Sequence, residues 1–154
     1  MNFGKGAIAD VNWASFRVLR GTGDDLAKAL IRFLQSENSS AGEVAWKDLE
    51  NVVFAQDTIY EAAEPTVMVL LAALADERPV HVRGWIIELL FFLLNGGSLD
   101  DPGLAARCRA RASSGVWLLA REARLSEGAA RDAIVNVLRI IDPDVAEKIA
   151  RWLT

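Results

Sequence analysis

Two long apolar stretches in the middle of the chain constrain the fold more than any other feature. They are residues 65–75 (PTVMVLLAALA) and residues 84–94 (GWIIELLFFLL). Each is well short of the roughly 20 apolar residues that a helix needs to span a bilayer. Both would be apolar around most of a helix, so other parts of the protein have to cover them on several sides. We therefore expect two buried central helices.

Helical periodicity also dominates the rest of the chain. One face of residues 23–37 carries apolar side chains at the spacing of an amphipathic helix, and Asp24 or Asp25 is available as its N-cap. Comparable patterns predict helices within residues 43–54, 58–76, 79–97, 99–125, 126–142 and 142–154. Because no long segment alternates apolar and polar residues as a strand does, the expected class is all-α.

Proline, glycine and serine mark the expected interruptions of these helices. Pro65 lacks a backbone donor, so it predicts a kink or a new helix that begins near it. Pro79 and the glycines after Asn95 bracket a helix, because proline suits the first turn and glycine the end. Residues 113–115 (SSG) are the expected weak point of the segment 99–125.

An internal repeat accompanies these patterns. It aligns Trp46 with Trp85 at an offset of 39 residues and, at an offset of 40, it aligns two sets of aliphatic residues: Leu30, Ile31 and Leu34 with Leu70, Leu71 and Leu74. A period of about 40 residues with two helices per unit is typical of HEAT and armadillo arrays. We therefore expect residues 1–154 to form a single HEAT-like helical-repeat domain, a right-handed α-α superhelix of about seven or eight helices.

The charge is distributed unevenly along the chain. Residues 1–77 hold 6 Lys and Arg against 12 Asp and Glu, a net charge of -6, whereas residues 78–154 hold 11 against 9, a net charge of +2. The acidic first half argues against general nucleic-acid binding, which needs clustered basic residues. It favours a partner with a basic surface.

Residues 45–76 (AWKDLENVVFAQDTIYEAAEPTVMVLLAALAD) and 82–97 (VRGWIIELLFFLLNGG) resemble a group of small bacterial HEAT-like repeat proteins. The residues that carry the resemblance are Trp46, Leu49, Gln56, Thr58, Ile59, Tyr60, Ala62, Ala63, Leu71 and Leu74. The chain departs from the group at Asp57, where glycine is usual, and at Ala55, where histidine is frequent. The resemblance covers roughly residues 13–97.

Members of this group look like binding proteins rather than enzymes, and several are encoded beside polymorphic toxin or effector genes. The resemblance therefore implies a cognate immunity protein, which would bind and occlude a toxin or effector domain that has a basic surface. The alternative is a housekeeping scaffold or adaptor for other proteins, with the same fold and no toxin partner.

Residues 56–60 place Gln56, Asp57, Thr58 and Tyr60 almost side by side between two apolar segments. The favoured interpretation is structural: Asp57 or Thr58 would cap the next helix, and Tyr60 would pack its ring and bond its hydroxyl nearby. The functional alternative is an interface, since tyrosine is frequent at interface hot spots. The expected partner-binding residues are Asp57, Tyr60, Glu61 and Glu64.

Three other features have structural explanations. Glu88 stands alone in an apolar run, which favours a buried ion pair with Arg78 or with an arginine of residues 107–124. The alternative for Glu88 is a role in binding. Cys108 lies among alanines at helical spacing and is expected to be packed rather than nucleophilic. The arginines near it are expected to form a solvated face that also pairs with the acidic first half; they are Arg107, Arg109, Arg111, Arg121 and Arg124.

No catalytic constellation is recognisable in the sequence. His81 is the single histidine, and there is no phosphate-binding loop, dinucleotide fingerprint or serine elbow. We therefore expect no enzymatic activity, no metal and no cofactor, and neither nucleic-acid nor membrane binding. The single cysteine and the lack of a secretory signal favour the cytoplasm, and the expected state is a monomer or dimer.

Overall fold

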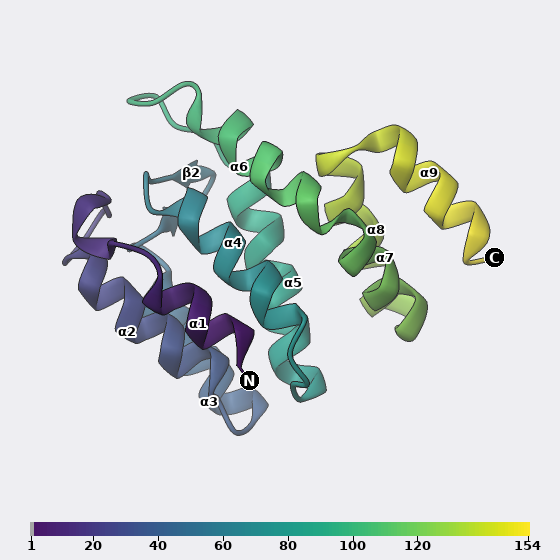
Figure 1. Ribbon diagram of the computed structural model, residues 1–154, viewed down its shortest axis with the longest axis horizontal. Helices are drawn as coiled ribbons and strands as arrows, with labels where there is room; N and C mark the ends of the chain where they lie inside the picture. Colours follow the sequence, from purple (N-terminus) through teal and green to yellow (C-terminus); the bar gives the residue numbers. More distant parts are fainter. Residues whose placement is uncertain (1) are drawn as a thin grey trace.

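The computed structural model describes residues 2–154 and is built almost entirely of helices (Figure 1). In chain order its elements are α1 (Phe3–Ala9), η1 (Trp13–Ser15), α2 (Gly23–Leu34), α3 (Ser39–Leu49), β1 (Phe54–Ala55), β2 (Thr58–Ile59), α4 (Ala63–Leu74), α5 (Val80–Asn95), α6 (Leu104–Ala112), η2 (Ser113–Gly115), α7 (Val116–Leu125), α8 (Gly128–Ile141) and α9 (Pro143–Trp152). The expected all-α class is confirmed, with one short hairpin added.

Local sequence signals explain the starts of α2 and α4. α2 begins with a capping box in which the Thr22 hydroxyl accepts from the backbone N–H of Asp25 at 3.1 Å, and the Asp25 carboxylate accepts from the N–H of Thr22 at 3.0 Å. The prediction that Asp24 or Asp25 is the N-cap is therefore wrong, because Thr22 takes that position. Pro65 lies in the first turn of α4, which confirms a helix that begins near it.

The expected weak point at residues 113–115 is confirmed as η2, a short 3-10 turn between α6 and α7. The hydroxyls of Ser113 and Ser114 donate to backbone carbonyls three residues earlier, at 2.6 and 2.9 Å. The backbone here lies close to α4, because a Cβ added at Gly115 would be 2.6 Å from Cδ2 of Leu71. The interruption therefore lets the chain turn while it stays packed on the core.

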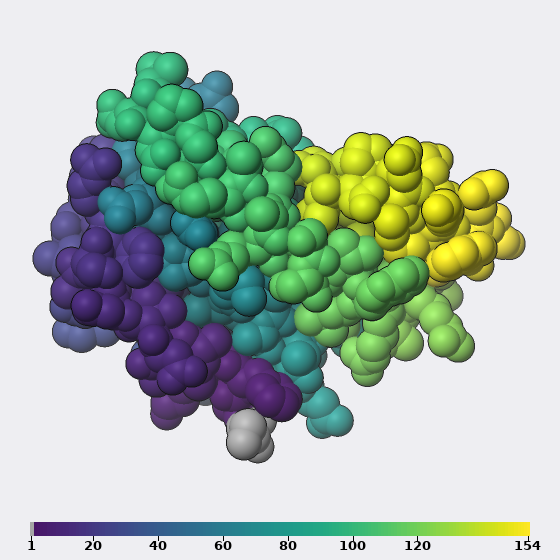
Figure 2. Space-filling view, turned by 45° about the horizontal axis from the view of Figure 1, so that its top comes forward, coloured from purple at the N-terminus to yellow at the C-terminus, as the bar shows by residue number. Residues whose placement is uncertain are grey.

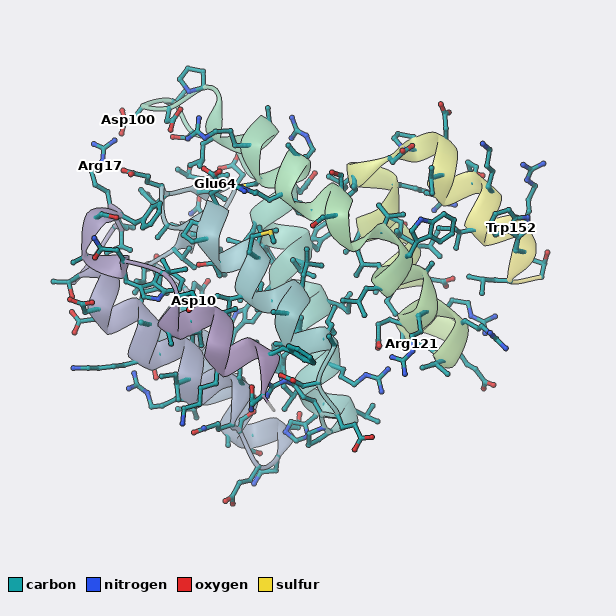
Figure 3. The ribbon with its side chains drawn as sticks, viewed as in Figure 1. Asp10, Arg17, Glu64, Asp100, Arg121 and Trp152 are labelled. Atoms are coloured by element: carbon teal, nitrogen blue, oxygen red, sulfur yellow. The ribbon has the colours of Figure 1, made fainter. Side chains whose placement is uncertain are left out.

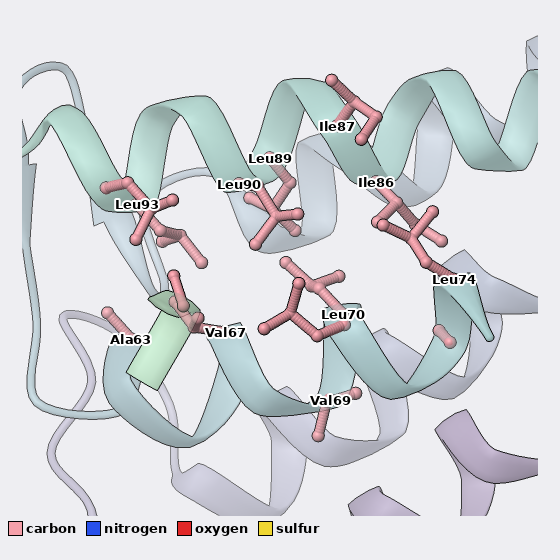
Figure 4. Packing of buried hydrophobic residues seen from close by; sticks show 14 of the residues in the cluster. Ala63, Val67, Val69, Leu70, Leu74, Ile86, Ile87, Leu89, Leu90 and Leu93 are labelled. Atoms are coloured by element: carbon pink, nitrogen blue, oxygen red, sulfur yellow. The ribbon is translucent and has the colours of Figure 1, made fainter. Parts of the chain in front are cut away.

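The helices form two layers (Figure 1). In one layer α4 lies between α1 and α6, and in the other α5 lies between α3 and α8. Figure 4 shows Leu70 and Leu74 of α4 pointing toward Ile86 and Leu90 of α5, whereas Ile87 lies on the side of α5 away from α4. The two apolar stretches are thus the central helices, as expected. Buried hydrophobic residues form one cluster that extends from Ile8 to Ile149.

A buried ion pair fastens α1 to the connection between α4 and α5. The Asp76 carboxylate accepts from the backbone N–H groups of Phe3 and Gly4 at 2.7 and 3.0 Å, and from Arg78 at 2.8 Å. Arg78 also donates to the carbonyls of Ala73 and Leu34 at 2.9 and 2.8 Å. Both charged side chains are only 7% exposed. This pair satisfies the first N–H groups of α1, which a helix cannot satisfy by itself.

Among residues 2–154, no helix combines the length and the apolar character that crossing a lipid bilayer would require.

Candidate functional site

Residues 54–59 form an antiparallel hairpin whose turn is Gln56 and Asp57. Phe54 pairs with Ile59 and Ala55 with Thr58, and Gln56 has a φ of 54°, in the left-handed region. α4 begins later, at Ala63, and no side chain caps it. The prediction that Asp57 or Thr58 caps the next helix is therefore wrong. Periodicity could not indicate the hairpin, because each strand has only two residues.

The hairpin is attached to the end of α5. The N–H of Ile59 donates to the carbonyl of Gly97, and the N–H of Gly97 donates to the carbonyl of Asp57, both at 2.9 Å. Gly96 permits this approach, because an added Cβ would lie 2.5 Å from Cγ2 of Ile59. Asp57 is consequently held beside the last turn of α5 with its side chain exposed.

The other three expected partner-binding residues lie at the start of α4, among arginines of this chain. Arg17 donates to Glu61 at 3.2 Å. Arg107 and Arg111 of α6 both donate to Glu64, at 3.0 and 3.1 Å, and the Glu64 side chain is only 20% exposed. Figure 3 shows Glu64 and Arg17 in the same region. Tyr60, directly before Glu61, is partly buried, and its hydroxyl forms no hydrogen bond with residues 2–154.

Arg107 also binds the loop that precedes α6. Its guanidinium donates to Asp101 at 2.6 Å, and this hydrogen bond holds the pKa of the Asp101 carboxyl below its usual value. The bonds to Asp101 and Glu64 in turn raise the pKa of Arg107. The prediction that the arginines pair with the acidic first half is confirmed for Arg107 and Arg111. The carboxylates of Glu61 and Glu64 are thus engaged within the chain.

α5 is not covered on every side. Val80, Gly84, Glu88 and Asn95 are exposed, and they follow one another at intervals of four, four and seven residues along one face of the helix. Two hollows of about 420 and 500 Å³ lie between this face and α8. The two hollows share four of their lining residues, Gly84, Ile87, Ala130 and Ala133, so they form one continuous depression.

A third hollow, of about 220 Å³, continues the depression to the hairpin. It is lined by Gln56, Asp57, Phe91, Phe92, Asn95 and Gly96, and it shares Phe91 and Phe92 with the hollow of about 500 Å³. We call the three hollows together the α5 trough. Asp57 is the one expected partner-binding residue that lines it, and Tyr60, Glu61 and Glu64 do not.

Small residues on both facing helices keep the trough open. A Cβ added at Gly84 of α5 would meet nothing within 4 Å. Across the trough, α8 presents the exposed alanines Ala129, Ala130 and Ala133. The depression therefore arises from missing side-chain volume and not from a gap in the backbone packing.

Replacing Gly84 with alanine should stabilise the protein. Glycine in the interior of a helix has more conformational freedom to lose on folding than alanine, and the added methyl group has open space. We expect the free energy of unfolding to rise by about 0.5–1 kcal/mol, measured by urea denaturation. A fall in stability would show that the space at Gly84 is not open.

Aromatic side chains form the wall of the trough near the hairpin. Phe92 lies 5.3 Å from Phe54, 5.7 Å from Trp46 and 5.9 Å from Phe91 between ring centroids, and Trp46 lies 5.2 Å from Trp85. These rings fix one another, because neighbouring aromatic rings attract at such distances. Phe91 and Phe92 are only partly buried and thus present a rigid apolar surface to the trough.

The free charges of the trough are acidic. Asp57, Glu88 and Glu127 line it and form no side-chain hydrogen bond or ion pair with residues 2–154. The prediction of a buried ion pair for Glu88 is therefore wrong, since its side chain is exposed. The buried carboxylate is instead Glu122, 3% exposed, which binds Arg83 and neutralises the single arginine of the trough.

The remaining conspicuous side chains have structural surroundings. Cys108 is fully buried, and burial raises the pKa of its thiol to about 12, which confirms the packed cysteine. His81 is partly buried, with Nε2 2.9 Å from the carbonyl oxygen of Ser36. Within residues 2–154, no cluster of three or more His, Cys, Asp or Glu side chains is arranged to hold a metal ion.

Comparison of the chain with protein-family models, with curated proteins and with solved structures found no match in any of the three. The HEAT-like identity and the toxin partner therefore stay predictions from the sequence.

Proposed function

We propose that this chain is a protein-binding module that holds a basic, apolar-faced helix of a partner protein in the α5 trough. The observation that carries the proposal is the combination of an open apolar floor with unpaired acidic side chains around it. Here the single arginine is neutralised by Glu122, so Asp57, Glu88 and Glu127 determine the charge that a partner meets.

The dimensions of the trough suit a helix. α5 has 16 residues, which corresponds to a length of about 24 Å and to roughly four turns of a partner helix beside it. Amphipathic helices bind grooves by inserting large apolar side chains one or two turns apart. The hollows beside Gly84 and beside Phe91 would receive two such side chains, and lysines or arginines next to them would meet Glu88 and Asp57.

The same proposal includes the role and the architecture that the sequence resemblance implies. The chain would be a right-handed superhelix of HEAT-like repeats and a cognate immunity protein, which neutralises a toxin or effector domain by occluding its basic surface. The acidic trough supports a basic partner, and the resemblance supports a toxin. The second candidate is a housekeeping scaffold with no toxin partner. The α5 trough supports this candidate equally, because a binding surface does not by itself indicate a toxin. A toxin gene directly upstream would favour the first.

Filling the trough should greatly weaken partner binding without unfolding the protein. In Gly84→Trp the indole would occupy the space between Gly84 and Ala133, so we expect the Kd for the product of the adjacent gene to rise by about a hundredfold or more. The measurement is isothermal titration calorimetry, together with rescue of growth when the two genes are co-expressed. Gly6→Trp is the matched control, because Gly6 is also an exposed helical glycine with open space around it, but in α1.

Unchanged binding by Gly84→Trp would place the interface elsewhere on the molecule. Charge reversal is an independent test of the trough: Glu88→Lys should weaken binding about tenfold at low salt, whereas Glu61→Lys should leave it unchanged. The opposite result would assign the interface to the predicted residues Tyr60, Glu61 and Glu64. If the unmodified chain neither binds the adjacent gene product nor protects against it, the immunity role is wrong.

A further inference from the structure

Two exposed tryptophans lie together at the end of the molecule opposite the N-terminal helices. Trp117 of α7 is 65% exposed and Trp152 of α9 is 68% exposed. Their ring centroids are 6.4 Å apart and their planes differ by 10°. Figure 2 shows α9 (yellow) standing out at one end of the molecule, and Figure 3 shows Trp152 at that end. Exposed large apolar side chains that lie together often mark an interaction site.

The tryptophans border a hollow of about 410 Å³ between α7 and α9. Its floor is apolar, with Ala120, Ile149 and Leu153, and its other lining residues are Arg121, Arg124 and Arg131. No aspartate or glutamate lines it. This hollow shares no residue with the α5 trough and has the opposite charge. We call it the tryptophan hollow.

The positive charge of the tryptophan hollow is largely unneutralised. Arg131 donates to the backbone carbonyls of Ala123, Ser126 and Leu153, at 3.1, 2.9 and 3.4 Å, so its guanidinium is fixed without an acidic partner. Arg124 forms no side-chain hydrogen bond or ion pair with residues 2–154. Arg121 has a single contact of 3.4 Å with the buried Glu122, which Arg83 already binds. Carboxylates supplied from outside would therefore be favoured here.

We propose that the tryptophan hollow is a second docking surface, which takes an acidic segment of a partner protein that carries an aromatic or aliphatic side chain. The apolar side chain enters the hollow against Trp117 and Trp152, and the flanking carboxylates pair with Arg121 and Arg124. Tryptophan and arginine are among the residue types that most often dominate binding energy at interfaces. This inference is independent of the function proposed for the α5 trough.

The charge argues against the two other occupants of such a surface. A two-fold dimer through the tryptophans would bring the arginines of one copy against those of the other, and like charges facing each other oppose association. A nucleic acid requires a basic path along several phosphates, whereas this hollow has three arginines on a chain whose net charge is -4. A short acidic segment needs favourable charge only at the hollow itself.

Fluorescence anisotropy with three labelled probes tests the proposal on the full chain at low salt. The probes are a peptide of glutamates around a central pair of phenylalanines, its lysine counterpart and an oligothymidine. We expect the acidic peptide alone to bind. Trp152→Ala and Arg124→Glu should each weaken it by about tenfold or more, as expected for interface hot spots. Val44→Ala, at an exposed apolar residue of α3, is the matched control and should not change binding.

Several results would overturn the proposal. The first is that the acidic peptide does not bind. The second is that it binds, but that Trp152→Ala and Arg124→Glu both leave its binding intact. The third is that the oligothymidine binds more tightly than the acidic peptide and that the same two variants weaken it. Sedimentation velocity supplies the last criterion: a dimer that Trp152→Ala dissociates would assign the surface to self-association. Because both variants change exposed side chains, circular dichroism should show unchanged folding.

Discussion

Replacing Asp76 with alanine should lower the free energy of unfolding by about 3–5 kcal/mol at neutral pH, because it leaves Arg78 charged and unpaired in a buried site. The substitution also removes the acceptor for the backbone N–H groups of Phe3 and Gly4 at the start of α1. Urea denaturation monitored by circular dichroism measures the loss. Asp76→Asn, which keeps an acceptor oxygen but not the charge, should cost less than Asp76→Ala.

Glu147 provides the matched control for this ion pair. It binds Arg139 at 3.0 Å, but its side chain is 63% exposed, so Glu147→Ala should cost less than about 1 kcal/mol. Equal losses for Asp76→Ala and Glu147→Ala would show that the Asp76–Arg78 pair does not hold α1 in place.

The effect of Asp76 should also depend on pH. Burial opposes ionisation of the Asp76 carboxyl, but hydrogen bonds from the N–H groups of Gly4 and Phe3 and from Arg78 outweigh it, so its pKa is lower than usual. A carboxyl whose pKa is lower in the folded state stabilises the protein fully above its unfolded pKa of about 3.9. That contribution is lost as pH falls through the folded pKa. The stability difference between the unmodified chain and Asp76→Asn should therefore shrink below about pH 4.

Gly23→Ala should destabilise the protein by about 3 kcal/mol or more. Gly23 is the first residue of α2, and an added Cβ would overlap the backbone carbonyl of Trp13. A backbone group cannot move aside as the end of a flexible side chain can. Relief would require η1 to shift, and η1 is fixed by the buried Trp13 indole, whose Nε1–H donates to the carbonyl of Ile8 at 2.8 Å.

Gly6→Ala separates this clash from the general effect of replacing a glycine. Gly6 lies within α1, and an added Cβ there would meet nothing within 4 Å. We expect Gly6→Ala to be neutral or to stabilise the protein by up to about 1 kcal/mol in the same denaturation experiment. Similar stabilities for Gly6→Ala and Gly23→Ala would contradict the close approach of α2 to Trp13.

The fold could be predicted from the sequence where apolar periodicity decides it. The two apolar stretches became the central helices α4 and α5, and residues 113–115 interrupt the helical segment as expected. Charged pairs could not be predicted in the same way. Asp76 and Arg78 stand in a loop of charged residues that suggests solvent exposure, yet contacts with α1, more than 70 residues earlier, bury them.

Hydropathy misplaced one carboxylate and did not indicate another. Glu88 lies in an apolar run, which suggests burial, but it occupies the uncovered face of α5. Glu122 was not singled out in the sequence, yet its side chain is buried and Arg83 binds it from α5, 39 residues earlier. The pattern of a single helix cannot show which side another helix leaves open.

The candidate site could be predicted only in part for the same reason. Asp57 was predicted together with Tyr60, Glu61 and Glu64 because the four residues are close in sequence. Asp57 does line the α5 trough, whereas the other three lie in another region of the molecule, near the start of α4. Gly84 was the feature of the sequence that could have indicated the α5 trough. A glycine in the interior of an apolar helix has a cost in stability, so its presence indicates either close packing or a space kept open.

The attachment of α1 through Asp76 has a consequence for the order of events on the ribosome. The two N–H groups that Asp76 binds are made 73 and 72 residues before it. At a synthesis rate of about 5–20 residues per second, α1 has to wait roughly 4–15 seconds for its anchor, and longer until the anchor leaves the exit tunnel. α1 is synthesised before α2, α3 and α4, but it can therefore reach its final position only after all three have been made.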